Sequence, residues 1–107
     1  MRVSRSLLVL GLLALGAPTV EAQRDPVARL EAARAANPRN IAALRALGVA
    51  YYKANRFADA RAVLDQARGL DPRDGVSALY AGLAAEGQQD FAAAKAAYND
   101  YLRVGRS

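Results

Sequence analysis

The chain has 107 residues, of which 15 are basic and 10 acidic, so its formal net charge is +5. A chain of this length forms one domain at most. It contains no histidine and no cysteine, which excludes the commonest general base, the thiol nucleophile, the usual transition-metal ligands and disulfide bonds. We therefore expect a protein that is not an enzyme, with no catalytic site, no cofactor and no metal site.

The N-terminus has the pattern of a secretory signal peptide over residues 1–22. A short basic head is followed by an unbroken apolar run from Leu7 to Ala17. Val20 and Ala22 are the small or β-branched residues that a signal peptidase accepts before its cleavage point. We expect cleavage after Ala22 and a mature chain exported to the periplasm.

An N-terminal membrane anchor is the alternative interpretation of the same run. A bilayer span needs about 20 apolar residues, and the run from Leu7 to Ala17 is well short of that length. Cleavage would remove Arg2, Arg5 and Glu21, leaving residues 23–107 with 13 basic and 9 acidic side chains and a net charge of +4. The mature chain would then contain no stable membrane span.

Five helices are predicted after this leader. The first starts at the N-cap Asp25 with Pro26 in its first turn, carries Leu30, Ala33 and Ala36 at helical spacing, and ends before Pro38. The other four are predicted over about 41–53, 57–70, 75–86 and 91–104. No segment has the alternating pattern of a strand.

The predicted helices repeat at a fixed spacing of about 34 residues, which indicates stacked helical hairpins. Such units recur because each one buries its apolar face only against its neighbours. The equivalent pairs are Leu47 and Ala81, Gly48 and Gly82, Phe57 and Phe91, Ala60 and Ala94, and Leu64 and Tyr98.

Two equivalent glycines, Gly48 and Gly82, fall in the middle of predicted helices, where glycine costs about 1 kcal/mol relative to alanine. Their presence in both units predicts a close helix crossing, with Ala60 and Ala94 as the opposing surface. Aromatic side chains are expected to fill the gaps between the hairpins, namely those of Tyr51, Phe57, Phe91 and Tyr98.

These motifs resemble the tetratricopeptide repeat family. The first copy covers 41–74 and carries Leu44-x-x-Leu47-Gly48-x-x-Tyr51, then Ala60, Leu64, Ala67 and Asp71-Pro72. A second, more degenerate copy covers 75–107 with Ala78-x-x-Ala81-Gly82, Phe91, Ala94, Tyr98 and Tyr101. Residues 23–40 are similar to the second helix of a preceding unit. The resemblance implies an all-α, right-handed solenoid of helical hairpins, with about two and a half repeats.

The resemblance also implies a concave groove that binds peptide segments of partner proteins through the first helix of each unit. Independently, Arg45, Val49 and Tyr52 form an i, i+4, i+7 row beside the packed stripe. The expected groove residues are Arg45, Val49, Tyr52, Lys53, Leu79 and Leu83, with Ala42, Val76 and Glu86 at the remaining groove positions.

Each of these groove residues also has a plainer interpretation. Leu79 and Leu83 either anchor a partner's peptide or pack against the preceding hairpin or further chain. Arg45 and Lys53 either hold an acidic peptide or are simply solvated. Some members of the family grip a C-terminal carboxylate with Lys and Asn side chains, but Val49 and Leu83 stand where Asn would be needed.

The expected partner is a protein or peptide, or a second copy of the chain. Nucleic acid is not expected, although the pI is about 10.1, because basic residues alternate with acidic ones and form no dense patch. We expect an exported bacterial adaptor or assembly factor of the cell envelope. The alternative is an N-terminal docking or oligomerisation arm of a longer protein, with the functional domain beyond Ser107.

Overall fold

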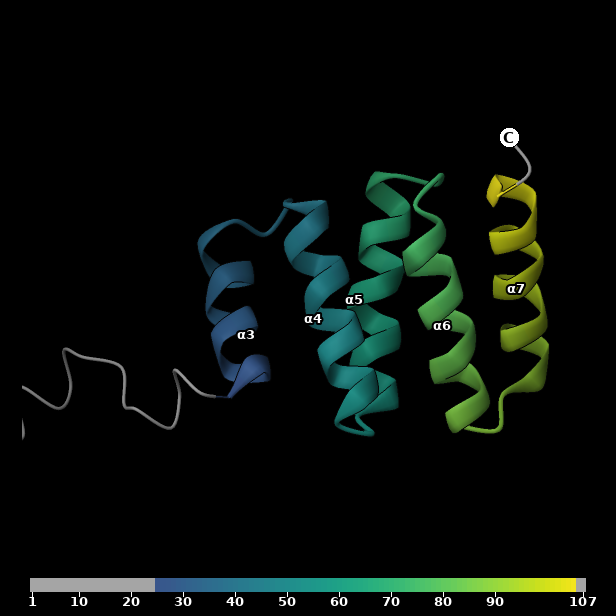
Figure 1. Cartoon of the computed structure of the whole chain (residues 1–107), viewed down its shortest axis with the longest axis horizontal. Coiled ribbons are helices and arrows are strands. Elements are labelled where there is room, and N and C mark those ends of the chain that lie inside the picture. Colours follow the sequence, from purple (N-terminus) through teal and green to yellow (C-terminus); the bar gives the residue numbers. More distant parts are fainter. Residues whose placement is uncertain (1–24, 106–107) are drawn as a thin grey trace, which may run out of the picture.

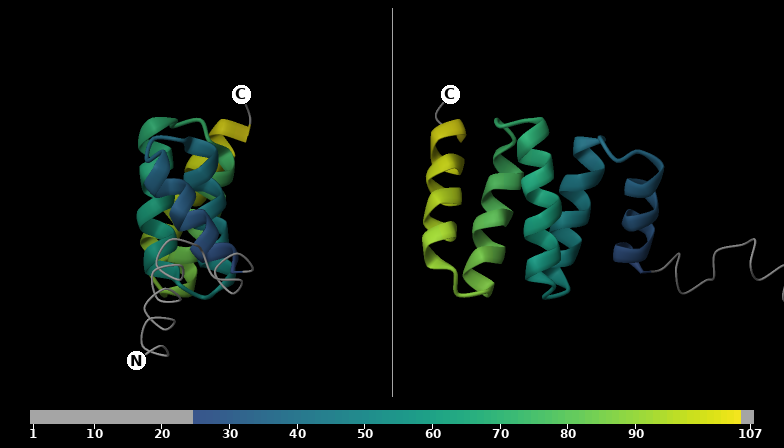
Figure 2. Two further views of the ribbon diagram at one scale, coloured as in Figure 1. Left: turned by 90° about the vertical axis from the view of Figure 1, so that its left-hand side faces the viewer. Right: turned by 180° about the vertical axis from the view of Figure 1, so that it is seen from behind.

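The computed structural model of the chain describes residues 25–105, and the predicted signal peptide lies outside this range. Five helices follow one another in a single row, which Figure 1 and Figure 2 show from opposite sides. They are α3 (Pro26–Ala36), α4 (Ile41–Lys53), α5 (Phe57–Leu70), α6 (Gly75–Gly87) and α7 (Phe91–Gly105). The predicted all-α stack of hairpins is confirmed, and α6 and α7 each extend one residue beyond the predicted end. No described helix is long and apolar enough to cross a membrane.

Side-chain caps fix where the helices begin. Asp25 accepts a hydrogen bond from the backbone N–H of Val27 (3.0 Å), which satisfies a donor in the first turn of α3. The Asn40 and Asp74 side chains cap α4 and α6 by accepting from the backbone N–H three residues on, at 3.1 and 3.2 Å. These two caps occupy equivalent positions in successive units. The predicted repeat therefore extends to the helix starts.

The ends of α4 and α6 are also built alike. Asn55 and Gln89, which are again equivalent in the repeat, have φ of 61°. The backbone N–H that follows each donates back five residues, Arg56 to Tyr51 at 2.8 Å and Asp90 to the equivalent carbonyl at 2.9 Å. This is a Schellman end, in which a left-handed residue reverses the chain tightly. It sets the antiparallel pairing within each hairpin.

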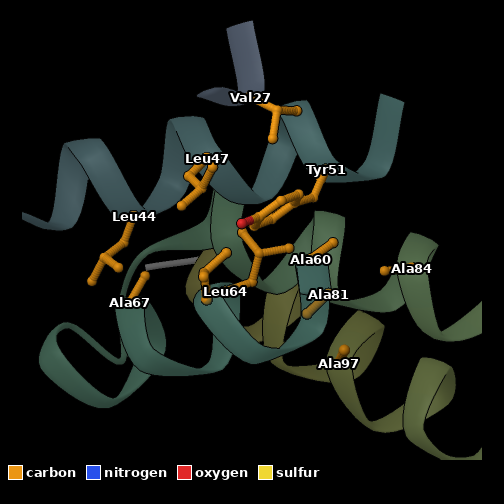
Figure 3. Packing of buried hydrophobic residues seen from close by; sticks show 11 residues of the cluster. Val27, Leu44, Leu47, Tyr51, Ala60, Leu64, Ala67, Ala81, Ala84 and Ala97 are labelled. Atoms are coloured by element: carbon orange, nitrogen blue, oxygen red, sulfur yellow. The ribbon is translucent and has the colours of Figure 1, made fainter. Parts of the chain in front are cut away.

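The core is one cluster of buried side chains from all five helices, mostly alanine, valine and leucine together with Tyr51, and Figure 3 shows its packing. Gly48 and Gly82 lie beside it and mark the predicted close crossings. A Cβ on Gly48 would overlap the Leu64 side chain, and one on Gly82 would lie 2.5 Å from the Tyr98 ring. The prediction that Ala60 and Ala94 oppose the glycines is therefore wrong. The large residue one turn beyond each alanine lies over the glycine.

Of the four aromatic residues predicted to fill gaps between hairpins, Tyr98 instead lies over Gly82 within its own hairpin. Tyr51 is buried, and Phe57 lies over Gly87, where a Cβ would come within 2.6 Å of its ring. Phe91 is the equivalent of Phe57, yet its side chain is 67% exposed. The prediction that Phe91 fills a gap is wrong, because no described helix follows α7 to supply the surface that α6 supplies to Phe57.

The first helix packs less closely than the others. α3 contacts α4 through Val27, which is buried, and Leu30, which is half-buried. The other two residues predicted on the same apolar stripe, Ala33 and Ala36, are both exposed, so this part of the prediction is wrong. Helix α3 therefore buries its first turns best. Among the helices of residues 25–105, α4 is the one against which it packs.

Candidate peptide-binding surface

Arg45 is tied to the start of α6. Its Nε donates to Asp74 Oδ2 at 3.0 Å, and the Arg45 side chain is 39% exposed whereas that of Asp74 is 3% exposed. Asp74 also accepts from the backbone N–H and the hydroxyl of Ser77, at 3.2 and 3.0 Å. Burial acts to raise the pKa of Asp74, but the hydrogen bonds from Arg45 and Ser77 outweigh it, so the pKa lies below its usual value.

Tyr52 lies at the junction of three helices. Its ring centroid is 5.6 Å from that of Tyr80 on α6 and 5.7 Å from that of Phe57 on α5. Offset and edge-on aromatic pairs at such distances are stabilising. Tyr52 is half-buried, so this predicted groove residue is also part of the packing between α4, α5 and α6.

Val49 and Lys53 lie elsewhere on α4. Together they line a hollow of about 450 Å³ on the side of α4 that meets α3. The remaining lining residues are Asp25, Pro26, Val27, Leu30, Ala46, Ala50 and Ala54. This lining is mostly apolar, and its charged side chains are one carboxylate and one ammonium.

Leu79 and Leu83 are on α6, where Leu79 is half-buried and Leu83 is likewise only partly exposed, and neither lines the hollow beside α3. The six predicted groove residues thus fall into three environments. Arg45 and Tyr52 join α4 to α6, Val49 and Lys53 line the hollow, and the two leucines lie along α6. Their part in binding a partner stays a prediction.

Sequence comparison gives the same picture as the row of helices with its repeated caps and glycine crossings. A family model described as tetratricopeptide repeat matches residues 21–86, which is more than half of the chain. The chain belongs to the tetratricopeptide repeat (TPR) family. No curated protein matches it. TPR domains are protein–protein interaction modules and are generally non-catalytic.

The sequence analysis missed the side-chain hydrogen bonds between the second helices of successive TPR units. Arg34 Nη2 donates to Gln66 Oε1 at 2.8 Å, and Arg68 Nη2 donates to Asp100 Oδ2 at 2.5 Å. The second pair is the first displaced by one repeat. Asp100 is therefore not simply a solvated carboxylate. The period itself is the signal that could have found these pairs, since it relates both donor and acceptor.

Two tyrosines of the TPR units donate hydrogen bonds to carboxylates. The Tyr51 hydroxyl donates to Glu31 on α3. Burial, and to a lesser extent this hydrogen bond, raises the pKa of Tyr51 to about 12. Burial and a hydrogen bond to Glu86 likewise raise the pKa of Tyr98 to about 12. Both phenols are therefore held in their neutral form. Glu31 and Glu86 act as structural acceptors here.

Proposed function

We propose that this TPR protein is an exported adaptor or assembly factor of the cell envelope that binds peptide segments of partner proteins. Its binding surface is formed by the first helices α4 and α6. Membership of the TPR family supports protein binding. The proposed location is supported by two contacts between α4 and α6, the Arg45–Asp74 ion pair and the edge-on contact of Tyr52 with Tyr80. Because of these contacts the two helices present one surface.

Export is supported by the basic head, the apolar run from Leu7 to Ala17 and the Ala22 cleavage point. The test is the intact mass of the protein from an envelope fraction of the source cells. A mass that begins at Gln23 is expected. A mass that retains residues 1–22 would contradict the exported mature form.

Partner binding is tested by capture from envelope extract with the purified protein. We compare the unchanged protein with Leu79→Ala on α6 and with Lys95→Ala on α7. Lys95 is exposed on the second helix of its unit. Loss of a captured band with Leu79→Ala and its retention with Lys95→Ala is expected. Capture that is independent of both substitutions would contradict the proposed surface.

A second candidate function, a docking or oligomerisation arm of a longer protein, is favoured by one observation. Large apolar side chains are exposed on α7, with Phe91 67% and Leu102 51% exposed. A further domain would cover such a face. Sequencing the gene beyond the codon for Ser107 decides between the two. An uninterrupted reading frame supports the arm, and a stop codon contradicts it.

A further inference from the structure

Helix α3 leaves open a face that its equivalent in the next unit buries. Within residues 25–105, α3 is the end of the row (Figure 1). The equivalent residues on α3 and α5 are Pro26 and Ala60, Leu30 and Leu64, and Ala33 and Ala67. The three on α5 are fully buried, whereas on α3 Leu30 is half-buried and the other two are exposed. Helix α5 packs against the first helix of its own unit, α4, and the open face of α3 is the one that such a first helix would cover.

The hollow of about 450 Å³ beside α3 lies where that first helix would pack. Leu30 and Ala46 both line it. One repeat later, the equivalents of these two residues are Leu64 and Tyr80, and both contact α4. Leu64 does so at the close glycine crossing, and the ring centroid of Tyr80 is 5.6 Å from that of Tyr52. The hollow is therefore the position of a first helix against α3 and α4.

The leader has the pattern of a first helix at the matching positions. One repeat before α4, the equivalent pairs are Ser6 and Asn40, Leu10 and Leu44, Leu13 and Leu47, and Ala14 and Gly48. Leu44 and Leu47 are fully buried in the core, and the Asn40 side chain caps α4. Serine is also a favoured N-cap residue. The apolar run thus has a cap, two leucines and a small residue where the repeat places them.

The chain itself brings this segment to the hollow. The leader ends directly before Asp25, which is one of the residues that line the hollow. Residues 18–25 are enough to reverse the chain, because the complete units do so with residues 54–56 and 88–90. Ala14 has a Cβ that Gly48 lacks, but Leu30 is half-buried, so its side chain can turn aside.

We propose that, in the chain that still carries its leader, residues 7–17 form a first helix that packs into the hollow between α3 and α4 of the same chain. This goes beyond the function proposed above and requires no partner. The leucines of the run would leave water by packing against Leu30, Ala46 and Val49, which is favourable for apolar surfaces. Cleavage after Ala22, which belongs to the proposed function, would remove this helix and open the hollow.

Disulfide cross-linking tests the contact, because the chain has no cysteine of its own. The full chain is made by cell-free synthesis without membranes, so that the leader stays attached. Ala14→Cys is combined with Leu30→Cys, and the control combines Ala14→Cys with Ala32→Cys, which lies on the opposite side of α3. Mild oxidation is expected to link the first pair within one chain at a yield at least about fivefold above the control, since a disulfide requires closely placed Cβ atoms.

Two substitutions test the register of the leader helix. Leu13→Asp changes the equivalent of the buried Leu47, and Leu8→Asp changes the equivalent of the exposed Ala42. Both alter the hydropathy of the run equally. In the first cysteine pair, Leu13→Asp is expected to lower the disulfide yield at least about tenfold, because a buried carboxylate is costly, and Leu8→Asp to change it less than about twofold. Without added cysteines, hydrogen exchange of the α3 amides should be faster with Leu13→Asp than with Leu8→Asp.

Equal yields from the two cysteine pairs, or equal effects of Leu13→Asp and Leu8→Asp, would overturn the proposal. A disulfide that joins two chains would also overturn it, because the occupant of the hollow would then be the leader of a second copy. These measurements depend neither on export nor on partner capture, so the proposed function is decided separately by its own tests.

Discussion

The missing side chain of Gly48 and the side chain of Leu64 occupy the same space. A Cβ on Gly48 would overlap Leu64 Cγ, and Leu64 is fully buried. Separating the α4 backbone from the core around Leu64 would cost free energy, because protein interiors are close-packed. This contact fixes the spacing of the α4–α5 hairpin.

Gly48→Ala is therefore expected to destabilise the protein. Overpacking costs about 1–3 kcal/mol, which exceeds the gain of up to about 1 kcal/mol from replacing a helical glycine. Gly69→Ala on α5 is the matched control, since no atom lies within 4 Å of its added Cβ. Thermal unfolding should show a lower midpoint for Gly48→Ala and an equal or higher one for Gly69→Ala. A rise for both would contradict the close crossing.

Asp74→Ala is expected to cost more stability than Asn40→Ala. Both remove a helix cap, worth typically about 1 kcal/mol, but only Asp74 is also bonded to Arg45 and to the Ser77 hydroxyl. Urea unfolding measures the difference. Because the pKa of Asp74 lies below its usual 3.8, its contribution is present above that pH and is lost as the pH falls below it. An equal loss of unfolding free energy in Asp74→Ala and Asn40→Ala would contradict the added stabilising role of Asp74.

Alkaline pH is expected to destabilise the fold through its two perturbed tyrosines. The pKa values of Tyr51 and Tyr98 are raised from 10.0 to about 12 in the folded chain. Their stabilising contribution is complete well below the ordinary pKa and is lost as the pH rises from 10.0 through about 12. Thermal midpoints measured across this range should fall. Tyr51→Phe removes one of the two groups, so its midpoint should fall less steeply, and an unchanged slope would contradict the assignment.

Leu79→Ala and Tyr52→Ala are expected to differ. Tyr52 packs against Phe57 and Tyr80, so its truncation should lower the thermal midpoint as well as weaken partner capture. Leu79→Ala should weaken capture and leave the midpoint close to that of the unchanged protein. A lowered midpoint with capture retained would show that Leu79 belongs to the core and not to the binding surface.

The helices and their order could be predicted because periodicity, caps and Pro or Gly breaks are local signals. The repeat also relates the caps Asn40 and Asp74 to each other. It could not show which residue faces Gly48, because Ala60 and Leu64 lie one turn apart on the same stripe. That choice depends on how far one helix is shifted along the other.

The candidate site was less predictable for a related reason. Arg45 and Tyr52 can be placed beside the packed stripe from their spacing, but their partners Asp74 and Tyr80 belong to the junction with α6. Contacts between units depend on the angle at which hairpins stack, which no spacing within one helix determines. The prediction for Phe91 is wrong for a similar reason, since its exposure depends on whether another surface covers the end of the stack.

In the described part of the chain, α3 packs against one helix, α4, and this affects which part of the protein unfolds first. Helix α3 rests on α4 through Val27 and Leu30, with Arg34 bonded to Gln66 at its far end. In a stack of units coupled to their neighbours, the least coupled end unfolds first and independently. Hydrogen exchange should therefore be fastest in the α3 amides. Each such opening would uncover the hollow lined by Val49 and Lys53, exposing transiently an apolar surface that the closed structure partly conceals.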